Sequence, residues 1–378
     1  MNSLGVAMIG YGGIARAHAQ GWRDLTLHYA LPADRVRLVG VATRRLASAQ
    51  TAAAELGCPI ATIDAAALIQ RDDVNVVDIC TPPASHLEYV RLAVAAGKHI
   101  YLEKPVATSL AEAREIGTLV RASGVTCLVN FTNRWLPAAQ RMRALIGEGF
   151  VGTITSVRAR YCRGSHASPA RPRTWRHILA ESGGGAFADL GAHIIDLVMW
   201  MAGPIVEVMA ESRIVIPRRP LTAGGSALGP VDTDDETRAL IRLGSGATGT
   251  LETSRVTIGA ANDLVFEIQG DRGALRYSLD DPNGLWAYDG TVSEPRRGWT
   301  RIETIQRYAG AAHPDWAAAI GVARGHAESQ YQFARAVWDR TAGDPGVDAG
   351  IAAQAVIEAA YRSASARAWA SVDMEPQG

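Results

Sequence analysis

The sequence predicts an α/β protein in two parts. A doubly wound parallel sheet extends to Asn130, and an α/β part with a mostly antiparallel sheet follows. Before Asn130, short apolar runs alternate with longer segments of helical periodicity, as is typical of βαβ units. Between Ile205 and Ile305, apolar runs follow one another with only turn-rich connectors between them, which indicates antiparallel strands.

In the first part, strands are expected at 6–9, 36–42, 74–80, 99–102 and 125–130, and helices at 15–25, 47–56, 86–96 and 109–123. Right-handed crossovers place the carboxyl ends of parallel strands along one edge of a sheet, and open α/β sheets bind their ligands at that edge. Gly10, Thr81 and Lys104 each follow such a strand end. We therefore expect these three positions to converge.

The second part is expected to begin with a helix at 137–148, a strand at 153–161 and a polar loop at 165–173. A strongly apolar helix at 186–201 comes next. Strands are expected at 206–216, 237–243, 247–256, 264–269 and 273–278, with turn-rich connectors at 217–229 and 280–284. Two alanine-rich helices, at 328–341 and 349–369, close the chain.

Composition limits the function classes. Lys+Arg and Asp+Glu both number 38, so the chain as a whole does not attract nucleic acid or an anionic membrane. No run of 18 apolar residues predicts a membrane span. The four cysteines (Cys58, Cys80, Cys127 and Cys162) are far apart and predict free thiols, with neither a disulfide framework nor a metal site. Because no leader-like segment precedes the first strand, we expect a cytoplasmic protein.

The first expected strand ends in a glycine turn of the form G-x-G-x-x-A, made by Gly10, Gly12, Gly13, Ile14 and Ala15. Its first glycine permits a tight turn, its second allows close approach of a pyrophosphate, and its small last residue lets helix and strand pack closely. Since the turn lies between a strand and a helix of a βαβ unit, it predicts a dinucleotide site.

The residues after the second strand bear on the choice between NAD and NADP. An acidic side chain there would bind the ribose hydroxyls and repel a 2′-phosphate. This chain has Thr43-Arg44-Arg45 instead, and no acid from Val36 until Glu55. Because an arginine fork suits a phosphate, this sequence favours NADP. The alternative is that both arginines are solvated and NAD binds through Thr43 and the backbone.

Two further strand ends carry candidate residues. Thr81-Pro82, followed by His86, is either a rigid strand-to-helix turn or a wall beside a nicotinamide ring. Glu103-Lys104-Pro105 is more informative, because a lysine at a buried strand end needs a partner. Lys104 would hydrogen-bond the oxygen that changes between alcohol and ketone. The alternative is a surface Glu/Lys pair before a turn proline.

Asp189 and His193 are four residues apart on an expected helix, so they share one face. His193 would take the hydroxyl proton as hydride leaves, and Asp189 would orient the imidazole or bind a second substrate hydroxyl. Gly183-Gly184-Gly185 before the helix suits close approach of a ligand or backbone. The alternative for His193 is a hydrogen-bonded core residue, and Asp196 is a weaker candidate for catalysis.

Together these residues resemble the Gfo/Idh/MocA family of oxidoreductases, which includes glucose–fructose oxidoreductase and inositol dehydrogenase. The matching segments are Gly10 to Ala15, Thr81-Pro82 with His86, Glu103-Lys104-Pro105, Asn133-Arg134-Trp135 with Pro137, Trp175-Arg176, and Gly183 to Asp196. The resemblance implies a Rossmann domain over residues 1–130. It also implies a substrate and oligomerisation domain over 131–378 with a large open sheet. In this division the last helices can pack against the Rossmann domain. The large sheet commonly joins subunits in the family, which predicts a homodimer or a homotetramer.

The resemblance implies reversible oxidation of a secondary alcohol on a sugar, inositol or related polyol. Lys104, Asp189 and His193 correspond to its catalytic set. Trp175 and Arg176 would lie beside the nicotinamide, and Asn133 and Arg134 beside the substrate. The whole expected coenzyme set is Gly10, Gly12, Gly13, Ile14, Ala15, Thr43, Arg44, Thr81, Pro82, His86, Glu103, Lys104, Trp175 and Arg176.

Two alternative functions remain open at this point. In one, a tightly held nicotinamide cycles internally, as in a sugar–sugar oxidoreductase or a redox-assisted glycosidase. In the other, the protein is a nucleotide-binding regulator without turnover. Every hypothesis in which the protein is an enzyme requires Lys104 and His193 to lie over the same face of the nicotinamide ring.

Overall fold

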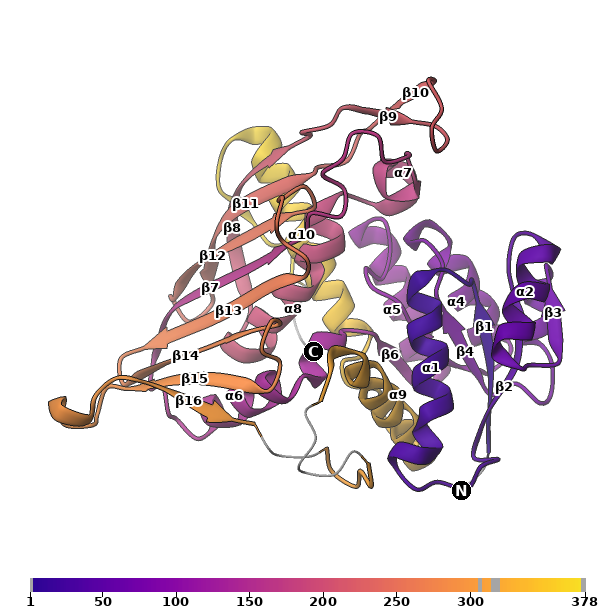
Figure 1. Ribbon diagram of the computed structural model, residues 1–378, viewed down its shortest axis with the longest axis horizontal. Coiled ribbons are helices and arrows are strands. Elements are labelled where there is room, and N and C mark those ends of the chain that lie inside the picture. The colour runs from indigo at the N-terminus through magenta and orange to yellow at the C-terminus, as the bar shows by residue number, and fades with distance from the viewer. Residues whose placement is uncertain (1–2, 305–307, 314–319, 375–378) are drawn as a thin grey trace. The chain divides into compact units, whose positions relative to one another are not determined.

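The computed structural model describes residues 3–304, 308–313 and 320–374 (Figure 1). These residues form two compact units. The first comprises the described residues up to Ala107, then Ala111–Trp135, and those from 308 to Ile351. The second comprises Thr108–Leu110, the described residues from Leu136 to 304, and those from Ala352 onwards. The described residues from 308 to Ile351 thus belong to the first unit although they follow residue 130 in the sequence.

The first unit contains a six-stranded parallel sheet. Its strands are β1 (Leu4–Ile9), β2 (Val36–Ala42), β3 (Ile60–Thr62), β4 (Val76–Ile79), β5 (His99–Leu102) and β6 (Cys127–Val129). Its helices are α1 (Gly13–His28), α2 (Leu46–Leu56), α3 (Ala65–Ile69), α4 (His86–Ala95), α5 (Leu110–Ser123) and α9 (Val322–Asp339). The strand order is β3-β2-β1-β4-β5-β6, so the order reverses between β1 and β4. This confirms the predicted doubly wound sheet, whose ligand site lies at the reversal.

The core of the first unit depends on α9, which comes from much later in the sequence. The rings of Trp22 on α1, Tyr101 on β5 and Phe333 on α9 meet edge to face, with centroids 5.5–6.1 Å apart. Each of the three side chains is at most 1% exposed. Aromatic pairs in this arrangement stabilise a core beyond their buried area. Helix α9 is therefore an integral part of this unit.

The second unit is built on a nine-stranded sheet in the order β16-β15-β14-β13-β7-β12-β11-β8-β17. The strands are β7 (Ile154–Cys162), β8 (Ile205–Arg213), β11 (Glu236–Leu243), β12 (Thr248–Ser254), β13 (Asp263–Gly270), β14 (Gly273–Ser278), β15 (Gly284–Asp289), β16 (Trp299–Glu303) and β17 (Ala370–Ser371). Only the β7–β12 pair is parallel among these described strands. The predicted mostly antiparallel sheet is thus confirmed.

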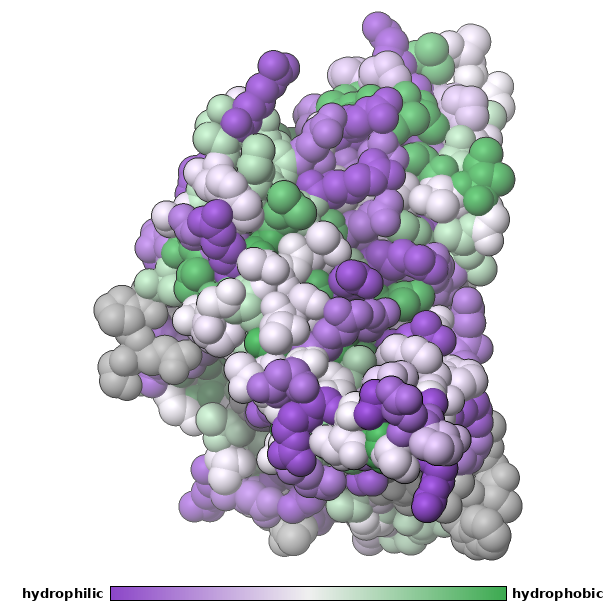
Figure 2. Space-filling view, turned by 90° about the vertical axis from the view of Figure 1, so that its left-hand side faces the viewer, coloured by the Kyte–Doolittle hydropathy of each residue, from purple (hydrophilic) through white to green (hydrophobic). Residues whose placement is uncertain are grey.

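The remaining elements of the second unit are α6 (Pro137–Gly147), η3 (Trp175–His177), α7 (Leu179–Ser182), η4 (Phe187–Gly191), α8 (Ala192–Ala202), a hairpin of β9 (Arg218–Pro220) and β10 (Leu228–Pro230), η5 (Glu294–Arg296) and α10 (Val347–Ala366), whose first residues lie in the first unit. Strand β11 alternates buried and exposed residues, as expected when one face of a sheet is covered. The uncovered face pairs charges across strands, for example Arg160 with Asp263 at 3.1 Å and Arg242 with Glu207 at 2.7 Å. The view from this side mixes hydrophilic and apolar side chains (Figure 2).

Several elements differ from their predicted form. Strand β3 and helix α3 were not predicted, because three and five residues are too short to show a period. The stretch 217–229, expected to be turns, contains most of the β9–β10 hairpin, and strands β15 and β16 were missed. The expected apolar helix at 186–201 is a π-helical turn, η4, that continues as α8. The segment Leu179–Ala202 is long and apolar enough to cross a membrane, but it is largely buried within the fold.

Candidate active site

The glycine turn between β1 and α1 is shaped for a phosphate group. Gly10 has φ +90°, and a Cβ there would lie 3.0 Å from the carbonyl oxygen of Cys80 on the neighbouring strand segment. Gly12 and Gly13, by contrast, face open space. Helix α1 begins without a side-chain cap and without an acidic residue in its first turn. Its first backbone N–H groups therefore remain available to an anion, and the residues fit a dinucleotide pyrophosphate.

The carboxyl end of β4 lies beside this turn, as predicted, because β4 pairs with β1. Thr81 and Pro82 follow it, and Ser85 Oγ donates to Thr81 Oγ1 at 2.8 Å. His86 is fully buried behind this loop, with Nε2 3.0 Å from Thr81 O and Nδ1 3.1 Å from Val106 O. Burial lowers the pKa of His86, whereas the two backbone carbonyls favour the protonated ring. It links the loop after β4 to the loop after β5.

The end of β2 carries the residues expected to choose between coenzymes. Thr43 is anchored by its backbone N–H to Thr62 O at 3.1 Å and by its Oγ1 to Arg45 O at 2.8 Å. Arg44 and Arg45 are exposed. Neither guanidinium forms an ion pair with another residue in the part of the chain that the structure describes. Both are therefore accessible to a ligand.

Glu103 and Lys104 follow β5, two strands from β1. The backbone N–H of Glu103 donates to Ile79 O at 3.1 Å, which holds the start of the loop against β4. The Glu103 side chain is buried, at 6% exposed, whereas Lys104 is partly exposed and precedes Pro105 through a cis peptide bond. Lys104 therefore sits at the ligand edge of the sheet with its carboxylate neighbour directed into the protein.

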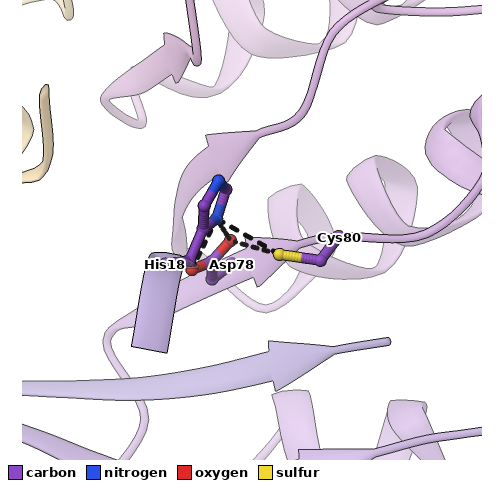
Figure 3. A group of neighbouring side chains, drawn as sticks. All are labelled: His18, Asp78 and Cys80. Atoms are coloured by element: carbon purple, nitrogen blue, oxygen red, sulfur yellow. Dashed lines mark hydrogen bonds and ion pairs between the residues drawn. The ribbon is translucent and has the colours of Figure 1, made fainter. Parts of the chain in front are cut away.

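A buried cluster centred on His18 of α1 includes Asp78 and Cys80 (Figure 3) and also contacts Glu103. His18 Nδ1 is 2.9 Å from Asp78 Oδ1, and its Nε2 is 3.0 Å from Glu103 Oε1. Carboxylates only accept hydrogen bonds, so both ring nitrogens carry a proton and the ring is a cation. Consistently, burial lowers the pKa of His18, but the charges and hydrogen bonds of Asp78 and Cys80 together outweigh it, and the pKa stands well above its ordinary value. No sequence motif predicted this cluster.

Neutral side chains complete the cluster. Trp22 Nε1 donates to Asp78 Oδ2 at 2.7 Å, and Asn130 Nδ2 donates to Glu103 Oε1 at 2.6 Å. Tyr101 OH in turn donates to Asn130 Oδ1 at 2.9 Å. Burial raises the pKa of Glu103, but His18, Lys104 and Asn130 outweigh it and lower the pKa to about 2. Glu103 is therefore a carboxylate at any pH at which the protein works.

His18, Asp78 and Cys80 are also residue types that bind metals, and their ligand atoms lie within 4.8 Å of one another. Their contacts are hydrogen-bond distances: Cys80 Sγ is 3.2 Å from both Asp78 Oδ1 and His18 Nδ1. A tetrahedral zinc ion with bonds of about 2.0–2.3 Å would hold such atoms roughly 3.3–3.5 Å apart. Since His18 is protonated on both nitrogens, the arrangement is that of a hydrogen-bonded cluster.

Asn133 and Arg134 lie in η2 (Thr132–Trp135), also in the first unit. Arg134 is 7% exposed, and its Nη1 is 3.2 Å from Asp344 Oδ1. The buried Nδ2 of Asn133 has no hydrogen-bond partner among the described residues. The environment of this amide therefore differs from that of Arg134, although the two residues were predicted to act together on substrate.

In the second unit, Asp189 lies in η4 and His193 in the first turn of α8. From Gly184 to Val198 every residue is buried except these two. Both face Tyr161 of β7: the His193 ring is 5.8 Å from the Tyr161 ring, and Asp189, after burial, helps to raise the pKa of the Tyr161 hydroxyl. The predicted shared face therefore exists, although the helix that carries it is partly π-helical, a feature frequent at functional sites.

Asp234, which the sequence analysis missed, fixes the start of this helix. Its carboxylate accepts from Gly185 N at 2.8 Å, from Phe187 N at 3.0 Å and from Tyr361 OH at 2.6 Å. A Cβ at Gly185 would collide with the backbone of Asp234. The three glycines were predicted to allow close approach of either a ligand or backbone. At Gly185 it is backbone that approaches closely. An aspartate cap of this kind satisfies the first free N–H groups of a helix.

Trp175 and Arg176 form η3 beside Asp189. Arg176 Nε is 3.3 Å from Asp189 Oδ2, and its guanidinium lies 4.2 Å from the centre of the Trp175 ring. The Arg176 carbonyl accepts from Arg255 Nη1 at 2.9 Å and from Thr233 Oγ1 at 3.0 Å. The structure thus brings Trp175, Arg176, Asp189 and His193 together. Asp196 is buried on α8, at 1% exposed.

The predicted site residues consequently fall into two groups. Lys104 belongs to the first unit with the glycine turn, whereas Asp189 and His193 belong to the second. Their meeting across one ligand stays a prediction.

The parallel sheet with a glycine cradle at its order reversal defines the class: a dinucleotide-binding oxidoreductase. Residues 4–131 match the model of the oxidoreductase family with an NAD-binding Rossmann fold, and residues 139–276 match the GFO/IDH/MocA C-terminal domain. The chain therefore belongs to the Gfo/Idh/MocA family, as its motifs predicted.

Several relatives have named substrates. The chain is 31% identical to levoglucosan dehydrogenase of Pseudarthrobacter phenanthrenivorans, over 98% of this chain and 99% of the relative. It is 27% identical to inositol 2-dehydrogenase of Rhizobium meliloti, over 71% and 73%. Among solved structures, levoglucosan dehydrogenase in complex with NADH and levoglucosan has a TM-score of 0.93 at 29% identity, covering 98% and 100%. An oxidoreductase domain protein from Kribbella flavida has the same TM-score at 32% identity, covering 100% of both chains.

Proposed function

We propose that this dehydrogenase oxidises a secondary alcohol of a sugar, anhydrosugar or cyclic polyol with a nicotinamide coenzyme. One observation carries the proposal: Asp189 and His193 are the two partly exposed residues between Gly184 and Val198, a buried helical stretch whose start Asp234 caps. An acid and an imidazole presented in this way suit proton transfer from a hydroxyl group. The substrates named for levoglucosan, D-apiose and inositol dehydrogenases support the class of alcohol.

In this proposal the first unit binds the coenzyme at the glycine turn, and the second binds the substrate. The coenzyme, when bound, supplies the acceptor for hydride. His193 takes the hydroxyl proton, Asp189 orients the substrate or the imidazole, and Lys104 hydrogen-bonds the oxygen that becomes a carbonyl. Arg176, stacked on Trp175 and paired with Asp189, holds that carboxylate in place. Asn133 and Arg134 act near the substrate, and Thr81 and Pro82 near the nicotinamide.

The role of Lys104 in turnover can be tested against a single control, because the chain contains only two lysines, Lys98 and Lys104. Turnover should be assayed with a panel of sugars, anhydrosugars and polyols, with NAD and NADP in separate reactions. Lys104→Ala should abolish turnover while coenzyme binding, measured by protein-to-NADH fluorescence transfer, persists. Lys98→Ala is the matched control, since Lys98 Nζ contacts only the carbonyls of Arg71 and Val74 among the residues described. Unchanged turnover in Lys104→Ala would remove this lysine from the mechanism.

The accessible guanidinium groups of Arg44 and Arg45 support NADP as the preferred coenzyme, although the solved levoglucosan dehydrogenase complexes contain NADH. Comparing kcat/KM for the two coenzymes tests this preference. Arg44→Ser should reduce kcat/KM for NADP by roughly tenfold, about 1.4 kcal/mol, and leave that for NAD unchanged. An equal effect on both coenzymes would show that Arg44 does not read the 2′-phosphate.

We also propose that the charged face of the nine-stranded sheet joins subunits of a cytoplasmic homodimer or homotetramer. Its exposed apolar side chains, Val206, Met209 and Leu240, lie among arginine–carboxylate pairs. Light scattering after gel filtration measures the assembly. A Leu240→Glu variant should shift it towards monomer.

A further inference from the structure

We propose that His18, held between the carboxylates of Asp78 and Glu103, is a positioning residue that keeps the Lys104 amine directed away from Glu103 and towards substrate. The inference rests on the role of Lys104 in the proposed function. It adds a group on α1 that touches neither coenzyme nor substrate. His18 acts here through Glu103, the residue that precedes the catalytic lysine.

Glu103 has more than one cationic neighbour. Its carboxylate accepts from His18 Nε2 at 3.0 Å, and the charge of Lys104 also acts on it. Glu103 is buried, and a buried carboxylate needs a partner. His18 supplies that partner from inside the protein.

Without His18, Asp78 and Glu103 would both lose the same partner. Asp78 would keep the indole N–H of Trp22, at 2.7 Å. Glu103 would keep only the amide of Asn130, at 2.6 Å, and a neutral donor does not balance a buried charge. Because burial lowers the pKa of the neighbouring His326 to about 4 and keeps it neutral, the cation left to act on Glu103 is the flexible side chain of Lys104. Its amine would turn to Glu103 and leave the position at which it serves the reaction.

The cluster is rigid enough to set a position. His18 is 0% exposed and lies on α1 within the core, with its ring 5.1 Å from the Tyr101 ring. Both ring nitrogens are occupied, and Asn130 is itself fixed by Tyr101. The contacts therefore form a continuous path from α1 to the loop that carries Lys104. Displacing a catalytic group by about 1 Å can reduce turnover on the order of 10²-fold.

The test combines kinetics with a direct observation of the amine. His18→Gln should lower kcat on the order of 10²-fold and leave the KM for coenzyme unchanged. In protein labelled with ¹⁵N at lysine Nζ, the two lysines give two signals. His18→Gln should shift the Lys104 signal and leave the Lys98 signal in place, with or without NADH.

A second substitution separates positioning from general stability. Glu103→Gln in the His18→Gln background removes the carboxylate that would draw the Lys104 amine away. The double variant should therefore have a kcat at least tenfold higher than that of His18→Gln alone. A merely structural cluster predicts a double variant that is no better than the single one. Ile116→Ala, buried on α5 outside the cluster, is the control that destabilises this unit without moving the Lys104 signal.

If His18→Gln does not fold, Asn130→Ala tests the same competition, because it removes the other donor to Glu103 and leaves His18 in place. It should shift the Lys104 signal in the same direction by a smaller amount. An unmoved Lys104 signal in both variants, or no recovery in the double variant, overturns the inference. If Lys104→Ala retains turnover while His18→Gln still moves the Lys104 signal, the proposed function of the lysine fails but its positioning by His18 stands.

Discussion

In the first unit one cation, His18, lies between the carboxylates of Asp78 and Glu103. The second unit has the inverse arrangement, in which one carboxylate, Asp235, lies between two arginines. Arg255 Nε is 2.9 Å from Asp235 Oδ1, and Arg219 Nη2 is 3.8 Å from the same atom. All of these residues are buried. Burial alone thus does not decide which charge a core carries, since the neighbouring groups decide it.

The histidines of the two units follow this difference. His166 and His177 lie in the second unit, with His166 Nδ1 3.1 Å from His177 Nε2. Burial lowers the pKa of each to about 3, helped by Arg171 for His166 and by Arg255 for His177. They are neutral at a pH at which His18 is charged. The same side chain is therefore a cation in one unit and a neutral hydrogen-bonding group in the other.

The largest expected effect comes from removing the shared carboxylate of the second unit. Asp235→Ala leaves Arg219 and Arg255 buried without their carboxylate and also removes the acceptor of Val215 N and Ile216 N. Breaking a buried ion pair in this way costs about 3–5 kcal/mol. Urea unfolding measures it. A loss below about 1 kcal/mol would show that these arginines find water or new partners.

Asp78→Asn tests the first unit in the corresponding way and should have a smaller effect. His18 keeps Glu103, and an asparagine oxygen still accepts from Trp22. We expect a loss of about 1–3 kcal/mol in the free energy of unfolding, as for one buried hydrogen-bond partner. A loss as large as that of Asp235→Ala would show that Glu103 alone does not stabilise the buried charge of His18.

The pH dependence of stability should separate the two kinds of histidine. The unfolded chain binds protons at His166 and His177 near pH 6.5, whereas the folded pair does so only near pH 3. Unfolding therefore takes up protons between these values, and stability falls as the pH is lowered. A His166→Gln, His177→Gln variant should lose less stability between pH 6.5 and pH 4 than the parent. Urea midpoints at each pH provide the measurement, and identical slopes would contradict the prediction.

The smallest effect is expected for an ion pair on the surface. Arg160 and Asp263 on the outer face of the sheet are 3.1 Å apart but remain partly exposed. Arg160→Gln should change the free energy of unfolding by less than about 1 kcal/mol in the monomer. A larger loss in assembled protein, seen as a dependence of the midpoint on protein concentration, would indicate that this face is covered by another subunit.

Local sequence patterns predicted much of the sheet edge at which we expect the coenzyme to bind. Gly10 follows an apolar run and precedes a helix, and those neighbours define its surroundings. The His18 cluster was missed, although its signal is present. His18 lies at the i+3 position of the buried stripe Ala15, Ala19 and Trp22, and Asp78 interrupts the apolar strand β4. Charged or titratable residues at core positions of a parallel sheet and of a helix that covers it indicate a buried pair.

Other features depend on partners that are distant in the sequence. Asp234 caps a helix that begins about fifty residues earlier, and no local pattern joins the two. The π-helical turn at Asp189 leaves the spacing to His193 unchanged, so periodicity did not reveal it. Likewise, α9 has an ordinary amphipathic pattern, which shows that one face is buried but not which unit buries it.

Helix α9 also affects how the polypeptide matures. The hydrophobic cluster around Trp22 includes Ala327, Phe333 and Ala334, which the ribosome adds after the entire nine-stranded sheet except its last short strand. Synthesis proceeds at about 5–20 residues per second, so the nascent Rossmann segment spends on the order of ten seconds or more with that apolar surface uncovered. The half of the molecule that is translated first is therefore among the last to be completed, and it is the half on which we expect chaperones to act.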